Sequence, residues 1–103
     1  MKQDTIFVYM TYPTQEAAGK VARMLLEQRL IACSNVIQSI SMYWWEGKIE
    51  QADEWVMIAK TIERRFDDIV GAVKKYHHYQ VPCIVKVPVQ AEQAFGEWLE
   101  KCV

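Results

Sequence analysis

Apolar and polar residues divide the first third of the chain into a strand-length run and a helical segment. The run Ile6-Phe7-Val8-Tyr9-Met10 is continuously apolar, which predicts a buried central strand. Pro13 and Thr14 then end this strand, and Thr14 is a suitable N-cap for a helix. Apolar residues recur at helical spacing as far as about Arg29. The residues of this face are Ala18, Val21, Ala22, Leu25 and Leu26.

The middle of the chain predicts a long β-hairpin. One arm runs from Ala32 to about Trp45, a turn follows at Glu46-Gly47-Lys48, and the return arm includes residues 55–60. The first arm has about 14 residues, or roughly 45 Å at about 3.3 Å per residue. A domain of this size has a radius of gyration of only about 13 Å. The arm must therefore bend at a bulge or project onto a neighbouring molecule.

The first arm of this hairpin is apolar on both faces. Trp44 and Trp45 are adjacent in a strand, so they point to opposite faces. The remaining apolar residues of the arm divide between the same two faces: Val36, Ile40 and Met42 on one, Ile37 and Tyr43 on the other. Burial of both tryptophans in the core of a monomer is one interpretation. We favour the other, that one or both lie in a subunit interface or line a cleft beside it.

The last third of the chain predicts a helix, a strand and a final helix. The first of these helices is expected to begin after Thr61 as its N-cap, and the strand covers Cys83 to Val87 before Pro88. The expected buried stripe of the first helix is Ile62, Phe66, Ile69, Val70 and Val73, and that of the second is Phe95, Trp98 and Leu99. The order β-α-β-β-α-β plus a C-terminal helix predicts one ferredoxin-like α+β domain over residues 1–103, with its helices on one face of the sheet.

Composition narrows the class of protein. The chain has 103 residues, of which 51% are hydrophobic and 24% charged, so it is expected to fold. The net charge of -1 and the lack of a basic stripe argue against a nucleic-acid partner. No apolar stretch approaches the roughly 20 residues that span a bilayer, and no secretory pattern precedes the first strand. Cys33, Cys83 and Cys102 match neither a zinc spacing nor an even disulfide framework. We expect a cytoplasmic protein with reduced thiols.

Four segments carry a resemblance to the CutA divalent-cation-tolerance family. They are Ala32-Cys33-Ser34-Asn35-Val36, Tyr43-Trp44-Trp45-Glu46-Gly47-Lys48-Ile49, His77-His78-Tyr79-Gln80-Val81-Pro82 and Phe95-Gly96-Glu97-Trp98-Leu99. The resemblance covers roughly the full length of the chain. The third segment usually reads His-Pro-Tyr-Glu-Val-Pro in the family, so His78 and Gln80 depart from it. The resemblance implies a homotrimer of ferredoxin-like subunits whose hairpins pair across subunit boundaries. It also implies a role in the response to metal ions such as copper, with no established catalytic activity.

Metal-binding candidates are few. His77 is at the motif histidine, and Cys83 lies six residues further along, so the two residues could bind copper weakly if the fold brings them together. The alternative for His77 is a helix-terminal histidine that donates a hydrogen bond to a carbonyl. Cys33, Cys83, Met10 and Met57 also carry soft donor atoms, but burial in the core is the commoner role of such residues.

The aromatic hairpin suggests a second kind of site. Lys48, Lys60, Glu46 and Glu54 are either solvated or form a polar rim around an aromatic cleft. The cleft and interface residues that we predict are Tyr43, Trp44, Trp45, Lys48, Lys60 and Tyr79. No nucleophile with a base at motif spacing and no phosphate-binding glycine loop is present, so we expect no enzyme. Three functions are compatible with these residues: a trimeric metal-response protein, a sensor of the PII type that binds a small metabolite between subunits, and a trimeric scaffold for a partner protein.

Overall fold

The computed structural model of the protein describes residues 4–76 and 79–103. In chain order, its elements are β1 (Thr5–Tyr12), α1 (Gln15–Glu27), β2 (Cys33–Trp45), β3 (Lys48–Ile62), a 3₁₀ turn (Glu63–Arg65), α2 (Phe66–Lys74), β4 (Ile84–Pro88) and α3 (Gln93–Cys102). The strands form one sheet in the order β2-β3-β1-β4, and all neighbouring strands are antiparallel. This order confirms the predicted ferredoxin-like α+β fold.

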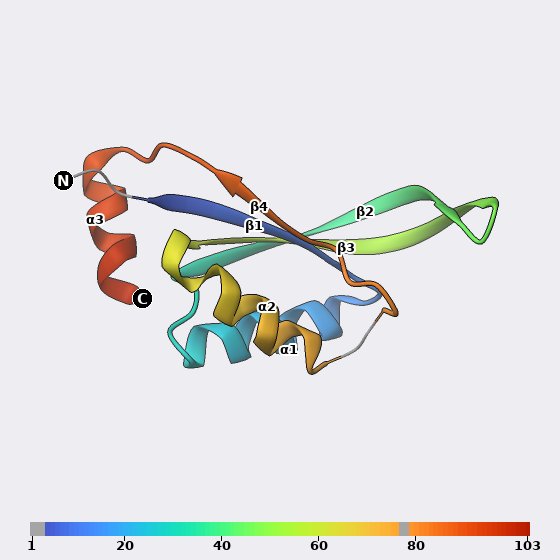
Figure 1. Cartoon of the computed structure of the whole chain (residues 1–103), viewed down its shortest axis with the longest axis horizontal. Helices are drawn as coiled ribbons and strands as arrows, with labels where there is room; N and C mark the ends of the chain where they lie inside the picture. The colour runs from blue at the N-terminus through green and yellow to red at the C-terminus, as the bar shows by residue number, and fades with distance from the viewer. Residues whose placement is uncertain (1–3, 77–78) are drawn as a thin grey trace.

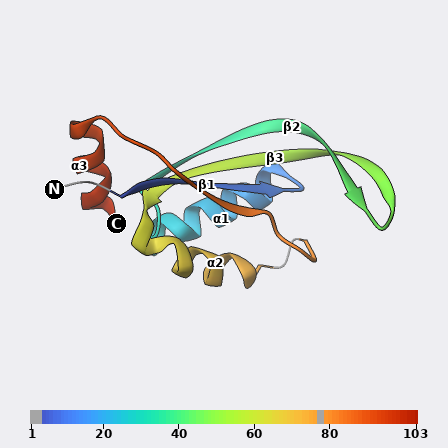
Figure 2. The ribbon, with the colours of Figure 1, turned by 45° about the horizontal axis from the view of Figure 1, so that its top comes forward.

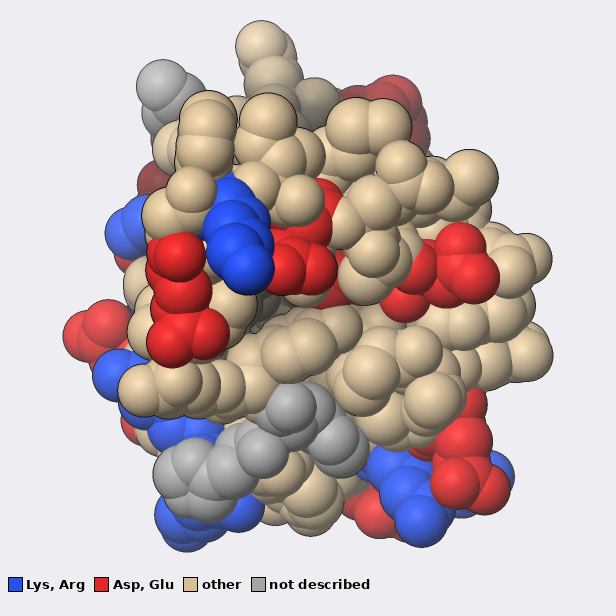
Figure 3. Space-filling model, turned by 90° about the vertical axis from the view of Figure 1, so that its right-hand side faces the viewer, with Lys and Arg blue, Asp and Glu red and all other residues tan. Residues whose placement is uncertain are grey.

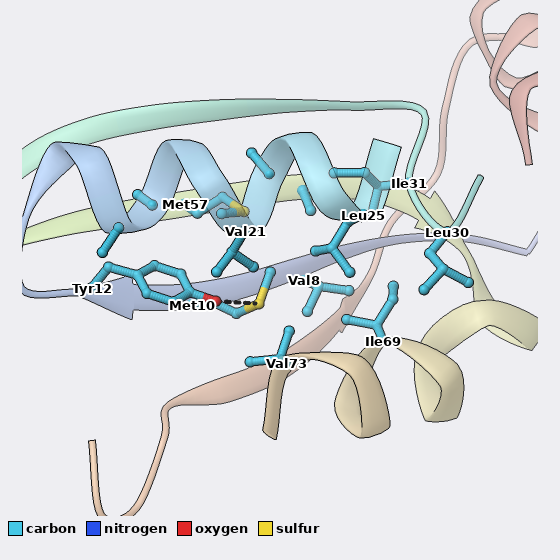
Figure 4. Packing of buried hydrophobic residues seen from close by; sticks show 14 of the residues in the cluster. Val8, Met10, Tyr12, Val21, Leu25, Leu30, Ile31, Met57, Ile69 and Val73 are labelled. Atoms are coloured by element: carbon cyan, nitrogen blue, oxygen red, sulfur yellow. Dashed lines mark hydrogen bonds between the residues drawn. The ribbon is translucent and has the colours of Figure 1, made fainter. Parts of the chain in front are cut away.

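Helices α1 and α2 cover one face of the sheet, whereas α3 lies at the end near the N-terminus (Figure 1). The core lies between these two helices and the central strands β1 and β3. Side chains from α1 and α2 point toward alternate residues of β1 and toward β3 (Figure 4). The Thr14 side chain accepts a hydrogen bond from the Ala17 amide at 3.0 Å, which confirms the predicted N-cap. The predicted apolar face of α1 is correct except for Leu26, which is 40% exposed.

The hairpin of β2 and β3 projects beyond the rest of the sheet (Figure 2). Its pairing runs without interruption from Cys33 opposite Lys60 to Trp45 opposite Lys48, so it contains no bulge. Glu46 and Gly47 have φ angles of 51° and 79°, as a two-residue type I′ turn requires. The molecule is 47 Å long but only 24 and 22 Å wide, which agrees with the length predicted for the arm. The arm therefore projects instead of bending at a bulge, and its contact with a neighbouring molecule stays a prediction.

The prediction for the start of α2 was wrong. Thr61 belongs to β3, is fully buried, and its hydroxyl donates to the Leu30 carbonyl at 2.7 Å instead of capping a helix. The chain enters α2 through the 3₁₀ turn, and no side chain caps that helix. At α3, Glu92 is the N-cap. Its carboxylate accepts hydrogen bonds from the backbone amides of Ala94 and Phe95.

The second face of the sheet is not covered by any described helix. In β1 the residues beneath the helices alternate with residues that point to this open face, among them Tyr9. The exposed apolar side chains of the open face include Tyr9, Ile37, Val85 and Val87. The predicted buried face of α3 is only partly correct, because Leu99 is buried whereas Phe95 and Trp98 are exposed and contact each other at 5.6 Å between ring centroids. The described chain therefore exposes two apolar areas.

Candidate functional site

A pocket lies where the open face of the sheet meets the segment that leads from α2 into β4. Its volume is about 580 Å³, which is within the range of roughly 300–1,000 Å³ that is typical of small-molecule sites. The residues that line it are Thr11, Ser41, Met42, Tyr43, Trp45, Glu54, Tyr79, Gln80, Val81 and Cys83. Most of these belong to β2, to β3 or to the segment 79–83.

Strand alternation and register bring the aromatic and acidic groups of the pocket to one face. Tyr43 and Trp45 are two residues apart in β2, so both point to the open face. Glu54 is paired with Ser39, an even number of residues from Tyr43, and therefore lies on the same face. The Ser39 hydroxyl donates to the Glu54 carbonyl at 3.2 Å, which holds the two strands together at this position.

A buried carboxylate forms the polar centre of the pocket. Glu54 is only 8% exposed, and the Tyr79 hydroxyl donates a hydrogen bond to its Oε2 at 2.6 Å. Burial, this hydrogen bond and the Glu54 charge raise the pKa of Tyr79, and the nearby Tyr43 adds to the effect. The phenol is therefore protonated at neutral pH and acts as a donor. Among the described residues, no ion pair includes Glu54.

Cys83 lies in the wall of the same pocket. Burial and the Glu54 charge raise the pKa of its thiol, and a hydrogen bond with Thr11 offsets part of this rise. The thiol is consequently protonated at neutral pH and is a poor nucleophile. A metal ion that bound here would have to displace this proton. Cys33 and Cys102 are also free thiols, and neither lines this pocket.

The structure brings four of the predicted residues together: Tyr43, Trp45, Tyr79 and Cys83. Lys48 lies opposite Trp45 at the hairpin tip and is exposed. Trp44 points to the other face of the hairpin and is 72% exposed in the protomer, so it does not line the pocket. His77 lies outside the described residues, so its proximity to Cys83 stays a prediction.

Lys60 does not line this pocket in a single protomer, and its place at a cleft or interface between subunits stays a prediction. Lys60 is paired with Cys33 at the end of the hairpin that is remote from its tip. Its Nζ donates to the Asn35 Oδ1 at 2.6 Å and lies 5.9 Å from the centroid of the Phe7 ring. Lys60 is eleven positions along the extended strand from Ile49 near the tip, a distance of roughly 36 Å.

Sequence reasoning did not place Glu54 and Thr11 in the site. Glu54 was one of four charged residues near the hairpin for which solvation and a place at a cleft were both open. Its hydrogen-bond partner is Tyr79, which is 25 residues away in the chain. Thr11 is the last open-face residue of β1, next to the pocket but outside the aromatic motif. Local sequence patterns contain no sign of either contact.

The soft and acidic side chains do not form a preformed metal centre in the part of the chain that the structure describes. Within residues 4–76 and 79–103, no group of three or more His, Cys, Asp or Glu side chains is arranged to hold a metal ion. Met10 and Met57 are fully buried, in agreement with the core role that we considered for them. The Tyr12 hydroxyl donates to the Met10 sulfur at 3.6 Å.

A larger hollow of about 1040 Å³ lies at the opposite end, between β1, the segment after β4 and α3. Its acidic lining residue Glu63 already forms an ion pair with Lys86 at 2.7 Å. Another lining residue, Glu92, caps α3. Two of its four acidic lining residues therefore have structural roles, and no aromatic residue is among the described residues that line it.

The surface around the hairpin tip carries charges of both signs. Figure 3 faces this end of the molecule and shows a mostly uncharged surface with acidic and basic side chains interspersed, without a basic patch on this side. None of the described helices is long and apolar enough to cross a membrane.

Fold and site together define an α+β protein of the ferredoxin-like class with an extended aromatic hairpin. The family model described as "CutA1 divalent ion tolerance protein" matches residues 6–102. The chain belongs to the CutA1 divalent-ion-tolerance family, as the sequence resemblance predicted.

Relatives and solved structures agree with this membership. The divalent-cation tolerance protein CutA of Archaeoglobus fulgidus is 41% identical over 98 residues, which cover 94% of this chain and 96% of the relative. A chloroplastic CutA 1 of Oryza sativa is 37% identical over 93% of this chain and 55% of its own length. The solved structure of the Archaeoglobus protein superposes with a TM-score of 0.93 at 39% identity, covering 95% of this chain and 97% of the other. That of the Oryza protein superposes with a TM-score of 0.94 at 34% identity, covering 99% and 95%.

Proposed function

We propose that the chain assembles as a homotrimer that takes part in the response to divalent metal ions and catalyses no reaction. The observation that carries the proposal is the uncovered face of the sheet together with the projecting hairpin. A lone protomer leaves Ile37, Ile40 and Met42 between 51% and 69% exposed. Ile37 lies on the open face, whereas Ile40 and Met42 lie on the other face of the hairpin, so both faces expose apolar side chains of the kind that marks an interaction site.

The edges of the sheet support assembly through the same region. Strand β2 is an edge strand of 13 residues, and its outer backbone groups have no partner strand among the described residues. A long, apolar edge strand pairs readily with another chain unless it is protected. β2 has an unbroken register without a bulge, and its only flanking charges are at the turn. Pairing of hairpins between copies would satisfy this edge and bury Trp44 at the same time.

Sedimentation of the purified protein at low micromolar concentration tests the assembly. We expect a trimer for the wild type and dissociation for Ile37→Lys, which places a charge on the open face. The matched control is Leu26→Lys, which places the same charge on an exposed position of α1 that packs against nothing in the proposed interface. A monomeric wild type, or an Ile37→Lys variant that remains trimeric, would contradict the proposal.

Metal binding in this proposal is weak and involves copper or another soft divalent or monovalent ion at Cys83. His77 is the second ligand in the proposal, on the basis of its motif position. The raised pKa of Cys83 supports modest affinity, because binding must remove a proton that burial and Glu54 hold on the thiol. Calorimetric titration with copper should show weaker binding by Cys83→Ser and by His77→Ala than by the wild type. Equal binding by all three proteins would remove both residues from the site.

A second candidate function is a sensor that binds a small metabolite. The observation in its favour is the pocket of about 580 Å³ with aromatic walls and one buried carboxylate. A thermal-shift screen of metabolites tests this candidate, because a ligand at 100 times its dissociation constant should stabilise the protein by about 2.7 kcal/mol.

The cytoplasm is the compartment that we propose. Its support is the set of three free cysteines, which fits a reducing environment. The relatives differ in this respect. The solved Archaeoglobus fulgidus protein is described as periplasmic, and the Oryza sativa and Arabidopsis thaliana proteins are described as chloroplastic. Fractionation of cells that express the protein would decide the compartment.

A further inference from the structure

We infer that the pocket around Glu54 binds an organic cation, specifically an alkylated ammonium group held between Trp45, Tyr43 and Tyr79. The inference rests on the second candidate function, the small-molecule sensor, and names the chemical class of its ligand.

Glu54 is a buried carboxylate that has no cationic partner among the described residues. A carboxylate that is 8% exposed loses most of its hydration, and such groups in proteins are paired with a cation or bound to a metal. The described residues form two ion pairs, Arg23 with Glu27 and Lys86 with Glu63, and neither reaches the pocket. The single hydrogen bond from the neutral Tyr79 phenol reduces the cost of burial without cancelling the charge. Within the described protomer, the pocket therefore has a negative charge and no positive one.

The walls of the pocket are rich in aromatic side chains. Tyr43 and Trp45 belong to β2 and Tyr79 to the segment before β4, and these three aromatic residues line the same cavity as the carboxylate. The faces of aromatic rings carry partial negative charge, and cages of such rings with an acidic group recognise alkylated ammonium ions. In the single protomer, Trp45 and Tyr43 are 40% and 41% exposed, so both rings are open to a ligand in the pocket.

Other ligand classes fit less well. A metal ion would find Glu54 and the protonated Cys83 but no third ligand among the described residues. An anion would be repelled by Glu54, and a neutral ligand would leave the buried charge without a partner. A volume of about 580 Å³ is larger than a bare ion needs and suits a small organic molecule. An organic cation satisfies the charge, the walls and the size together.

Calorimetric titration of the assembled wild-type protein with choline tests the inference. The control ligand is the neutral alcohol in which carbon replaces the nitrogen of choline, which keeps shape and size but removes the charge. We expect choline to bind at least about tenfold more tightly than this alcohol. Equal binding of both compounds, or no binding of choline, would overturn the inference.

Glu54→Gln removes the charge with little change of shape and should weaken choline binding at least about tenfold. The control variant is Asp53→Asn, because Asp53 is exposed and points to the opposite face of β3. It should bind choline like the wild type. If Glu54→Gln does not fold, Trp45→Leu should weaken binding about three- to tenfold by removing one wall of the cage. Unchanged binding by the folded variant would contradict the assignment.

The remaining outcomes separate this inference from the broader proposals. Sedimentation of the same samples reports the trimer independently of choline. If choline does not bind and Glu54→Gln dissociates the assembly, the cation in the pocket is a lysine or arginine of a second copy, and the inference is wrong while the trimer stands. If a neutral or anionic metabolite stabilises the protein and choline does not, the sensor stands and the organic cation is excluded.

Discussion

The hydrogen bond between Tyr79 and Glu54 should contribute measurably to the stability of the protein. It is the side-chain hydrogen bond that ties the segment before β4 to the hairpin, with a distance of 2.6 Å between the phenol and Oε2. A hydrogen bond to a charged group contributes about 1.5–3 kcal/mol, and an acceptor left unsatisfied in a buried site adds to the loss. Tyr79 is partly exposed, so solvent reduces this figure. We expect Tyr79→Phe to lower the free energy of unfolding by about 1.5 kcal/mol.

The assay is unfolding in guanidinium chloride at one fixed protein concentration, because assembly and folding are coupled. Tyr43→Phe is the matched control. It removes the same hydroxyl from the same pocket, but the Tyr43 hydroxyl forms no hydrogen bond with a described residue and should cost less than about 0.5 kcal/mol. Glu54→Gln and the double variant complete a double-mutant cycle with Tyr79→Phe. We expect a coupling energy of about 1 kcal/mol between the two sites.

Two results would refute this reasoning. Equal stability of Tyr79→Phe and Tyr43→Phe would show that the hydrogen bond contributes nothing beyond the loss of a hydroxyl. Strictly additive effects of Tyr79→Phe and Glu54→Gln would show that the two groups act independently, although they are in contact.

Three further predictions follow from burial and charge. Leu25→Ala should lower the free energy of unfolding by about 3 kcal/mol, because Leu25 is fully buried. Leu26→Ala, at a neighbour that is 40% exposed, should lower it by under about 1 kcal/mol. Equal losses would contradict the face that α1 turns toward the core. Trp44→Ala should leave protomer packing intact but shift the sedimentation profile toward smaller species, because this ring is 72% exposed in the protomer; an unchanged profile would exclude it from the interface. Alkylation of Cys83, followed by mass spectrometry, should be slow at neutral pH and should still accelerate above pH 9.0, the ordinary pKa of its thiol. Glu54→Gln should increase the alkylation rate at neutral pH, because it removes one cause of the raised pKa. An unchanged rate would contradict this cause.

Local patterns predicted the elements because their causes are local. The apolar run at Ile6 to Met10 became the centre of β1, and Thr14 caps α1 through its own side chain. Gly47 has the positive φ that the turn requires, so the hairpin tip was placed correctly. The return strand was longer than predicted, Lys48–Ile62, because its polar first half is held by pairing with β2 rather than by its own composition.

The sequence by itself therefore determined the order of elements, the ferredoxin-like class, the length of the hairpin and the family. Only the tertiary structure decided which residues form the site. Lys60 does not line the pocket of the protomer, because register fixes its position along the sheet and β3 is long enough to separate its two ends by most of the molecule. Glu54 was included because it is buried and Tyr79, 25 residues away in the chain, donates a hydrogen bond to it in the same pocket. A strand pattern marks the face to which a side chain points, but burial at that face depends on what the rest of the chain places over it.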